Sequence, residues 1–179
     1  MPDINIMDAL RKLDGQGSSQ PGLTSFQLRF GLSLLVGGTQ AGKTQTLANL
    51  LSEIVAAGRT AGIAQGAIPG DDRFSGGIPF YALSSLIHDL RTVPQGGIRD
   101  GVHVVLIDDF DEMVVSSLVG SPKCEEEGAT SREACDVAGM LDRMGKDKNI
   151  AILASWTPTI FGDLPQDFRY AGYPIYELG

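Results

Sequence analysis

The octapeptide GGTQAGKT at residues 37–44 constrains the fold of this chain more than any other feature. It satisfies the pattern G-x-x-x-x-G-K-[ST]. The apolar run 32–36 precedes it, and residues 43–57 follow with apolar side chains at helical spacing. A strand, a glycine-rich loop and an amphipathic helix in this order predict a phosphate-binding loop. The alternative is a glycine-rich turn that ends in Lys-Thr by chance, and the flanking strand and helix argue against it.

The residues of this loop have separate expected roles. Gly37 and Gly42 let the backbone turn so that successive N–H groups point inward, and the positive end of the next helix reinforces this anion cradle. Lys43, a candidate catalytic residue, is expected to reach the β- and γ-phosphates of a nucleotide, and the Thr44 hydroxyl to bind Mg²⁺. The expected nucleotide-binding residues are Gly37, Gly38, Thr39, Gln40, Ala41, Gly42, Lys43, Thr44 and Gln45.

A second chemical signal is the apolar run VHVVLI at 102–107, which ends in the carboxylates Asp108 and Asp109. Two charges after so apolar a strand are costly if they are buried and unpaired, and a hydrated Mg²⁺ ion removes that cost. We therefore expect Asp108 to bind Mg²⁺ and Asp109 to orient or deprotonate an attacking water molecule. The alternative is a solvated turn after a strand.

Short apolar runs alternate with amphipathic stretches along most of the chain. Strands are expected at 32–36, 62–68, 102–107, 150–154 and 174–178. Helices are expected at 43–57, 79–90 and 130–145. Pro79 suits the first position of the second helix, a capping box from Thr130 to Glu133 opens the third, and Gly145 ends it. This alternation predicts an α/β three-layer sandwich with a mostly parallel sheet.

Residues 1–25 include a turn-rich tract and are expected to form an amino-terminal arm or linker, so that the domain spans 26–179. Cys124 and Cys135 fit no zinc or redox spacing, which favours two reduced thiols. No apolar run approaches the roughly 20 residues of a membrane helix, and no signal peptide is recognisable. We therefore expect a cytoplasmic protein, or one packaged from a cytoplasm, without a membrane partner.

The charge balance limits the partners of this domain. The sequence has 14 Lys and Arg residues against 22 Asp and Glu residues, which gives a formal charge of −8. Such a chain repels polyanions at long range unless its basic groups are clustered. Any nucleic-acid partner must therefore be bound through a local group of basic residues.

Five segments in order carry a resemblance to a known family: GGTQAGKT, GIAQGAIPGDDR, VHVVLIDDFDEM, TSREACDVAGMLDRM and ILASWTPT. Over about residues 30–160 the chain resembles the RecA-like core of the hexameric packaging NTPases of double-stranded-RNA bacteriophages, the cystoviruses. The resemblance implies a RecA-like (ASCE) P-loop core that hydrolyses ATP or another nucleoside triphosphate with Mg²⁺. It further implies a homo-oligomeric, hexameric ring that moves single-stranded RNA into a viral capsid, contact with a capsid protein, and a location in the host cytoplasm or the virion.

The interval between Lys43 and Asp108 agrees with the RecA-like division of P-loop proteins. Proteins of this division have an extra strand and helix between the two motifs, and residues 62–90 supply both. The division also implies that the strand at 150–154 inserts beside the strand of the glycine-rich loop. The residues that follow this inserted strand are then candidate sensors of nucleotide state: Ser155, Trp156 and Thr157. For Trp156, packing in the core is an equal alternative.

The chain departs from the family at the positions of catalysis. The family has a catalytic glutamate shortly after the second strand, whereas residues 65–69 contain none. Asp71, Asp72 or Asp109 must substitute for it, or turnover is weak. Trp156 stands where an asparagine is expected near the end of its strand.

The arginine that neutralises the transferred phosphoryl group is also unassigned. The family continues beyond the position of Gly179 through strands that carry such arginines, so we expect either a minimal relative or a chain without its carboxy-terminal part. Arg132 and Arg169 are candidate arginine fingers, and an ordinary surface position is the alternative for each.

The RNA partner has weak support from charge, and two other functions stay open. In a ring, the loop 120–128 would lie near the channel or the next subunit, but Lys123 is its only basic residue and three glutamates follow at 125–127. One open alternative is another ATPase of the same division, such as a DNA-packaging or partitioning ATPase. The other is a nucleotide-binding assembly subunit with little turnover, which the missing glutamate favours.

Overall fold

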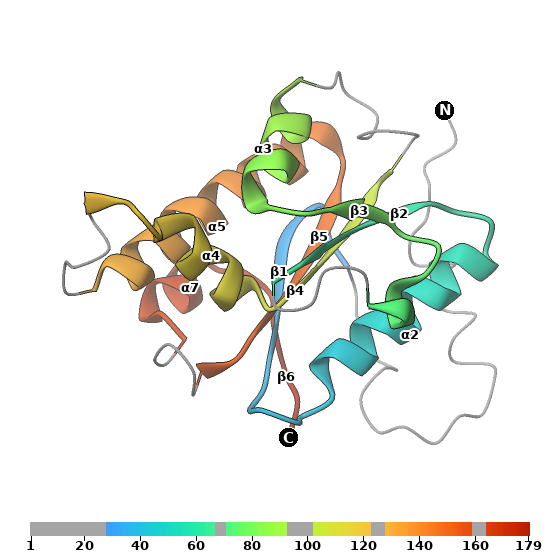
Figure 1. Cartoon of the computed structure of the whole chain (residues 1–179), viewed down its shortest axis with the longest axis horizontal. Coiled ribbons are helices and arrows are strands. Elements are labelled where there is room, and N and C mark those ends of the chain that lie inside the picture. Colours follow the sequence, from blue (N-terminus) through green and yellow to red (C-terminus); the bar gives the residue numbers. More distant parts are fainter. Residues whose placement is uncertain (1–27, 67–70, 93–101, 123–127, 159–163) are drawn as a thin grey trace.

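The computed structural model of this chain describes residues 28–66, 71–92, 102–122, 128–158 and 164–179. Within these ranges, six strands form one wholly parallel sheet with helices on both faces (Figure 1). The strands are β1 (Gly31–Val36), β2 (Ala61–Gln65), β3 (Ile78–Phe80), β4 (Val104–Asp108), β5 (Ala151–Trp156) and β6 (Ile175–Glu177). The predicted α/β class and parallel sheet are confirmed, while the predicted arm at 1–25 lies outside the described residues.

The order of the strands in the sheet is β3-β2-β4-β5-β1-β6. The strand β5 therefore lies between β1 and β4, with Val36 opposite Trp156 and Ile107 opposite Ala154. This confirms the predicted insertion of that strand beside the strand of the glycine-rich loop. Because all pairs are parallel, the carboxyl ends of β1, β2, β4 and β5 meet at one edge of the sheet, which is where open α/β sheets bind ligands.

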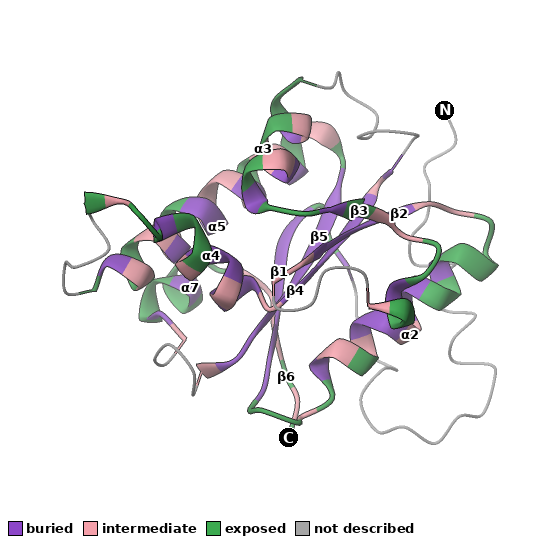
Figure 2. Ribbon diagram, viewed as in Figure 1, coloured by how far each residue is buried: buried purple, intermediate pink, exposed green. Residues whose placement is uncertain are grey.

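Helices cover the two faces unequally. On one face α2 (Lys43–Ala56) and the short 3-10 helix η1 (Asp72–Phe74) pack on one apolar cluster. The other face carries a second cluster covered by four helices (Figure 1), α3 (Leu83–Thr92), α4 (Phe110–Leu118), α5 (Ala129–Lys148) and α7 (Gln166–Tyr170). The buried strands lie between these layers (Figure 2), so the arrangement is a three-layer sandwich.

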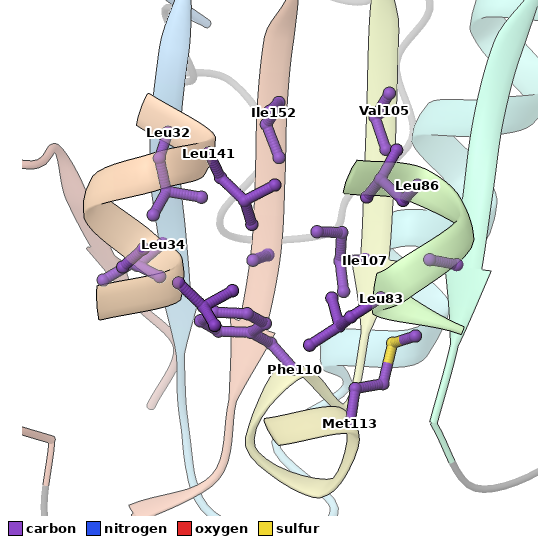
Figure 3. Packing of buried hydrophobic residues seen from close by; sticks show 14 of the residues in the cluster. Leu32, Leu34, Leu83, Leu86, Val105, Ile107, Phe110, Met113, Leu141 and Ile152 are labelled. Carbon is purple, nitrogen blue, oxygen red and sulfur yellow. The ribbon is translucent and has the colours of Figure 1, made fainter. Parts of the chain in front are cut away.

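The larger cluster fixes the start of α4 against the sheet. Figure 3 shows Phe110 of α4, Leu141 of α5 and Leu86 of α3 directed toward the strand side chains. All three helix residues are fully buried. Burial of large apolar side chains of this kind contributes about 1.5–3 kcal/mol each. The backbone that leads from β4 into α4 is therefore held in place from one face of the sheet.

The predicted role of Pro79 as the first residue of a helix is wrong. Pro79 lies in β3 opposite Ile63 of β2, and the helix begins at Leu83. The strand β3 is at the edge of the sheet, where a proline is tolerated because one side of the strand needs no N–H donors. The helical spacing that suggested the helix is real, but it begins one turn later with the buried Leu83, Leu86 and Leu90.

The predicted bounds of the helix at 130–145 are also wrong. The helix α5 begins at Ala129 after Gly128, which has a φ of 73° and provides no side-chain cap, so the Thr130 capping box does not form. The helix continues past Gly145 to Lys148. A Cβ atom added at Gly145 would lie 2.8 Å from the Cα of Gly31. Gly145 therefore allows α5 to approach β1 closely and does not end the helix.

Candidate functional site

The loop at residues 37–44, called here the GKT loop, joins β1 to α2 at the carboxyl edge of the sheet. Gly42 has a φ of +86°, which confirms that a glycine is needed for the turn before the helix. Gly37 is needed for space, because an added Cβ would lie 2.9 Å from the Cβ of Ala41 and 3.2 Å from the carbonyl oxygen of Leu178. At Gly38 an added Cβ would meet nothing within 4 Å, so this part of the loop borders open space.

The amino-terminal end of α2 is open to an anion. This helix of 14 residues has no side-chain cap and no acidic residue in its first turn. The first N–H groups of an α-helix have no partners within the helix, and the helix dipole adds positive potential there. The predicted cradle thus has unused donors at the end of a long helix.

Lys43 is the first residue of α2 and is buried, with 7% of its surface exposed. Its Nζ donates hydrogen bonds to the carbonyl oxygens of Gly37, at 2.7 Å, and Gly38, at 2.8 Å. Burial lowers the pKa of Lys43, and the charges of Asp111, Asp109 and Asp108 oppose this shift. The GKT loop is therefore folded around the side chain of Lys43. The sequence motif predicts a lysine at this position but does not predict these two hydrogen bonds.

Asp108 ends β4 and is buried directly beside the GKT loop. Its Oδ1 accepts hydrogen bonds from Thr44 Oγ1, at 3.2 Å, and from Ser155 Oγ, at 3.0 Å. Burial and the charge of Asp109 raise the pKa of Asp108, while these two hydrogen bonds and the charge of Arg73 oppose the shift. The structure therefore brings together Thr44 and Asp108, the two residues expected to bind Mg²⁺.

The donor set at Thr44 and Asp108 fits a magnesium ion bound together with a nucleotide. In the described part of the chain, no group of three or more His, Cys, Asp or Glu side chains is arranged to hold a metal. Mg²⁺ usually keeps several waters and takes one or two protein oxygens together with substrate phosphates. One hydroxyl and one carboxylate oxygen in contact are sufficient for that mode of binding.

Asp109 follows β4 in a left-handed conformation, with a φ of 54°, and is the N-cap residue of α4. Its backbone N–H donates to Ser155 Oγ at 2.8 Å. Burial and the charge of Glu112 raise the pKa of Asp109, and the charges of Lys43 and Arg73 oppose them. Asp109 is half-buried, so its carboxylate is only partly removed from solvent.

Asp111 also belongs to this region, although no sequence motif singles it out. It lies in the first turn of α4 and is fully buried. Neither carboxylate oxygen makes a well-formed hydrogen bond with the described residues, although the N–H groups of Asp111 itself and of Thr157 lie near enough to favour its charged form. Burial raises the pKa of Asp111 to about 6. The run DDFDE was the available signal, since it puts a third carboxylate within one helical turn of Asp108.

The candidate sensors after β5 have different environments. Ser155 is fully buried and connects Asp108 to the backbone of Asp109, as described above. Trp156 packs edge-on against Phe110, with ring centroids 6.1 Å apart, and against Phe168, at 5.6 Å. For Trp156 the core-packing alternative is therefore confirmed.

The remaining candidates lie away from the GKT loop or on the surface. Asp72 is exposed at the start of η1, and the neighbouring Asp71 binds Arg73. Arg132 is exposed in the first turn of α5. Arg169 forms an exposed ion pair with Glu177 of β6 at 2.9 Å. Lys123 and the glutamates at 125–127 lie outside the described residues.

No protein-family model matches this chain, and no curated protein is significantly similar to it. Among the helices that the structure describes, none has the length and apolar character needed to cross a membrane.

Proposed function

We propose that this chain is a Mg²⁺-dependent nucleoside triphosphatase with a RecA-like P-loop core. The observation that carries the proposal is the contact between Thr44 of the GKT loop and Asp108 at the end of β4, at 3.2 Å. Residues far apart in the sequence thus meet at the carboxyl edge of a parallel sheet, beside the open end of α2. The insertion of β5 between β1 and β4 supports the RecA-like assignment.

The residues of the GKT loop would bind the phosphates. The N–H groups at the start of α2 would donate to phosphate oxygens, and Lys43, already oriented by two carbonyl groups, would place its charge near the β- and γ-phosphates. Thr44 Oγ1 and Asp108 Oδ1 would hold Mg²⁺, which supplies neutralisation of phosphate charge when it is bound. These contacts position the substrate for hydrolysis.

Asp109 is the best-placed residue to orient the attacking water and accept its proton. It directly follows Asp108 and its backbone is fixed by Ser155. Its raised pKa makes the carboxylate a better proton acceptor than an ordinary surface aspartate. Of the other two candidates, Asp72 is exposed on η1 and Asp71 is paired with Arg73.

A motor function is the finer part of this proposal and derives from the resemblance alone. It comprises a hexameric ring, an arginine finger such as Arg132 from a neighbouring subunit, and transport of single-stranded RNA into a capsid. A DNA-packaging or partitioning ATPase is the competing enzyme. A nucleotide-binding assembly subunit with little turnover is the non-enzymatic alternative, and the lack of a glutamate after β2 favours it.

Phosphate release from ATP and GTP with Mg²⁺ tests the enzymatic proposal. We expect Lys43→Ala to abolish turnover, whereas Lys146→Ala, which removes an exposed lysine near Gly31 at the opposite edge of the sheet, should leave it unchanged. If the wild-type chain binds Mg²⁺-nucleotide but releases no phosphate at any concentration that permits assembly, the assembly-subunit alternative replaces the enzyme. A mass measurement with nucleotide and stimulation by RNA but not duplex DNA test the ring and its partner.

A further inference from the structure

A bidentate ion pair follows β2 on the face of the sheet that α2 covers. Asp71 accepts hydrogen bonds from the Nε of Arg73 on both carboxylate oxygens, at 3.0 and 2.9 Å, and Nη2 completes the pair. Asp71 Oδ1 also accepts from the backbone N–H of Arg73 at 2.9 Å, which caps η1. The guanidinium is therefore held in one orientation although 49% of the Arg73 side chain is exposed.

The segment that leads to η1 starts at the acidic edge of the sheet, because the backbone N–H of Gly66, five residues before Asp71, donates to the carbonyl oxygen of Asp108 at 3.1 Å. Phe74 anchors η1 in the apolar cluster under α2. The charge of Arg73 lowers the pKa of both Asp108 and Asp109, and both carboxylates contribute to the raised pKa of Arg73, after its hydrogen bond with Asp71. Arg73 thus lies within electrostatic reach of the two residues to which we assign metal binding and proton transfer.

The site needs a further positive charge. Asp108, Asp109 and Asp111 gather around Lys43, and a nucleoside triphosphate would add several negative charges. Phosphoryl transfer requires neutralisation of the terminal phosphate from the side that the loop does not cover. Arg169 is engaged by Glu177, and Arg132 lies on α5 in the other helical layer.

We propose that Arg73, oriented by Asp71, contacts the terminal phosphate of the nucleotide held by the GKT loop of the same chain, so that the site prefers triphosphates to diphosphates. This inference rests on the proposed function. Asp71 engages Nε and Nη2, and no described residue accepts a hydrogen bond from Nη1. Guanidinium has five donors in a fixed plane, so it can bind a carboxylate on one side and a phosphate on the other.

Binding of two nucleotides to the full chain tests the proposal. The probes are a fluorescent non-hydrolysable ATP analogue and the matching ADP derivative, both with Mg²⁺, followed by fluorescence anisotropy. Arg73→Ala should weaken the triphosphate about tenfold or more and change diphosphate affinity less than about twofold, because one charged hydrogen-bond donor to the terminal phosphate is lost. Turnover should fall about 100-fold. Arg73→Lys should recover part of the triphosphate affinity.

Arg91→Ala is the matched control, because Arg91 is an exposed arginine in the last turn of α3 on the opposite face of the sheet. If Arg73→Ala behaves as Arg91→Ala, or weakens both nucleotides equally, the inference is overturned while the proposed function stands. If the wild-type chain binds neither nucleotide, the proposed function fails and this inference fails with it.

Asp71→Asn tests the positioning step separately. Loss of the bidentate pair should reduce the preference for the triphosphate, by less than Arg73→Ala does, while diphosphate binding stays unchanged. If Asp71→Asn instead strengthens triphosphate binding, Asp71 competes with the phosphate for Arg73, and its assignment as a positioning residue is overturned.

Discussion

Two segments at the carboxyl edge of the sheet build the site by different means. The GKT loop depends on backbone geometry, with Gly42 in a left-handed conformation and Lys43 bound to the carbonyl groups of its own loop. The acidic turn, residues 108–111, depends on side chains from elsewhere, since Thr44 and Ser155 donate to the Asp108 carboxylate and Ser155 also accepts from the backbone N–H of Asp109. The loop is thus a local structure, and the acidic turn is a tertiary one.

This difference extends to electrostatics. Lys43 is buried but compensated by two carbonyl oxygens and three nearby carboxylates. In the acidic turn, the pKa values of Asp108, Asp109 and Asp111 are all raised by burial, and Asp111 has no well-formed hydrogen bond within the described residues. Strain and uncompensated charge are thus concentrated in the segment to which we assign the proton acceptor and the metal ligand, and perturbed pKa values of this kind cluster at functional sites. Substitutions in the two segments should therefore differ in how they change turnover, stability and the dependence of stability on pH.

The largest effect expected in the acidic turn is on turnover, from Asp108→Asn. Loss of the carboxylate should lower phosphate release about 1000-fold, because metal binding and charge neutralisation act together at this position. Folding should not be weakened, since the removed charge is buried with a raised pKa. Asp136→Asn, at an exposed position of α5, is the control. Equal turnover in both variants would remove Asp108 from the site.

Asp111→Asn should change how stability depends on pH. The pKa of about 6 in the folded chain, against an ordinary value of 3.8, means that the folded chain holds this proton more tightly than the unfolded chain. Raising the pH from about 3 to about 7 therefore removes stability, by about 3 kcal/mol in total for this group. Chemical unfolding at several pH values should show that loss in the wild type and not in the variant.

The comparison that isolates Asp111 uses the same Asp136→Asn control. Other carboxylates also titrate in this window, so the quantity to follow is the difference in unfolding free energy between wild type and each variant. Asp136 is exposed on α5, so its variant serves as the reference for the removal of one carboxylate. A difference for Asp111→Asn that stays constant with pH would contradict burial of an uncompensated carboxylate at this position.

The sequence predicts the structure of the GKT loop well and that of the acidic turn only in part. The GKT loop follows from eight contiguous residues, and the position of β5 is the one that the resemblance to RecA-like proteins implies. The burial of Asp111 and the interaction of Arg73, the partner of Asp71, with the acidic turn could not be predicted from the sequence. Both depend on how distant segments pack together in the fold. A local sequence signal is also misleading at Pro79. Proline favours the first turn of a helix, but here it lies in the edge strand β3, which tolerates it.

Two neighbouring glycines test how tightly the GKT loop is packed at each position. Gly37→Ala should lower the free energy of unfolding by about 1–3 kcal/mol, because its Cβ would lie 2.9 Å from Ala41 and 3.2 Å from the Leu178 backbone. Gly38→Ala should change stability by less than about 0.5 kcal/mol, because its Cβ enters open space. Chemical denaturation of both variants provides the measurement. Similar values for the two would mean that the loop adapts as a unit.

The smallest expected effect concerns the hydroxyl that joins the acidic turn to β5. Ser155→Ala leaves the Asp109 N–H without its acceptor and removes one of two donors to Asp108, and should lower stability by about 1–2 kcal/mol. Ser33 is a matched control, because it is equally buried on the adjacent strand β1 and its hydroxyl has no hydrogen-bond partner among the described residues. Ser33→Ala should be neutral or slightly stabilising by the same denaturation measurement. If both alanine variants lose the same stability, the Ser155 hydroxyl does not hold the acidic turn, and its backbone is fixed by the hydrogen bond from Gly66 to Asp108 and by the packing of Phe110.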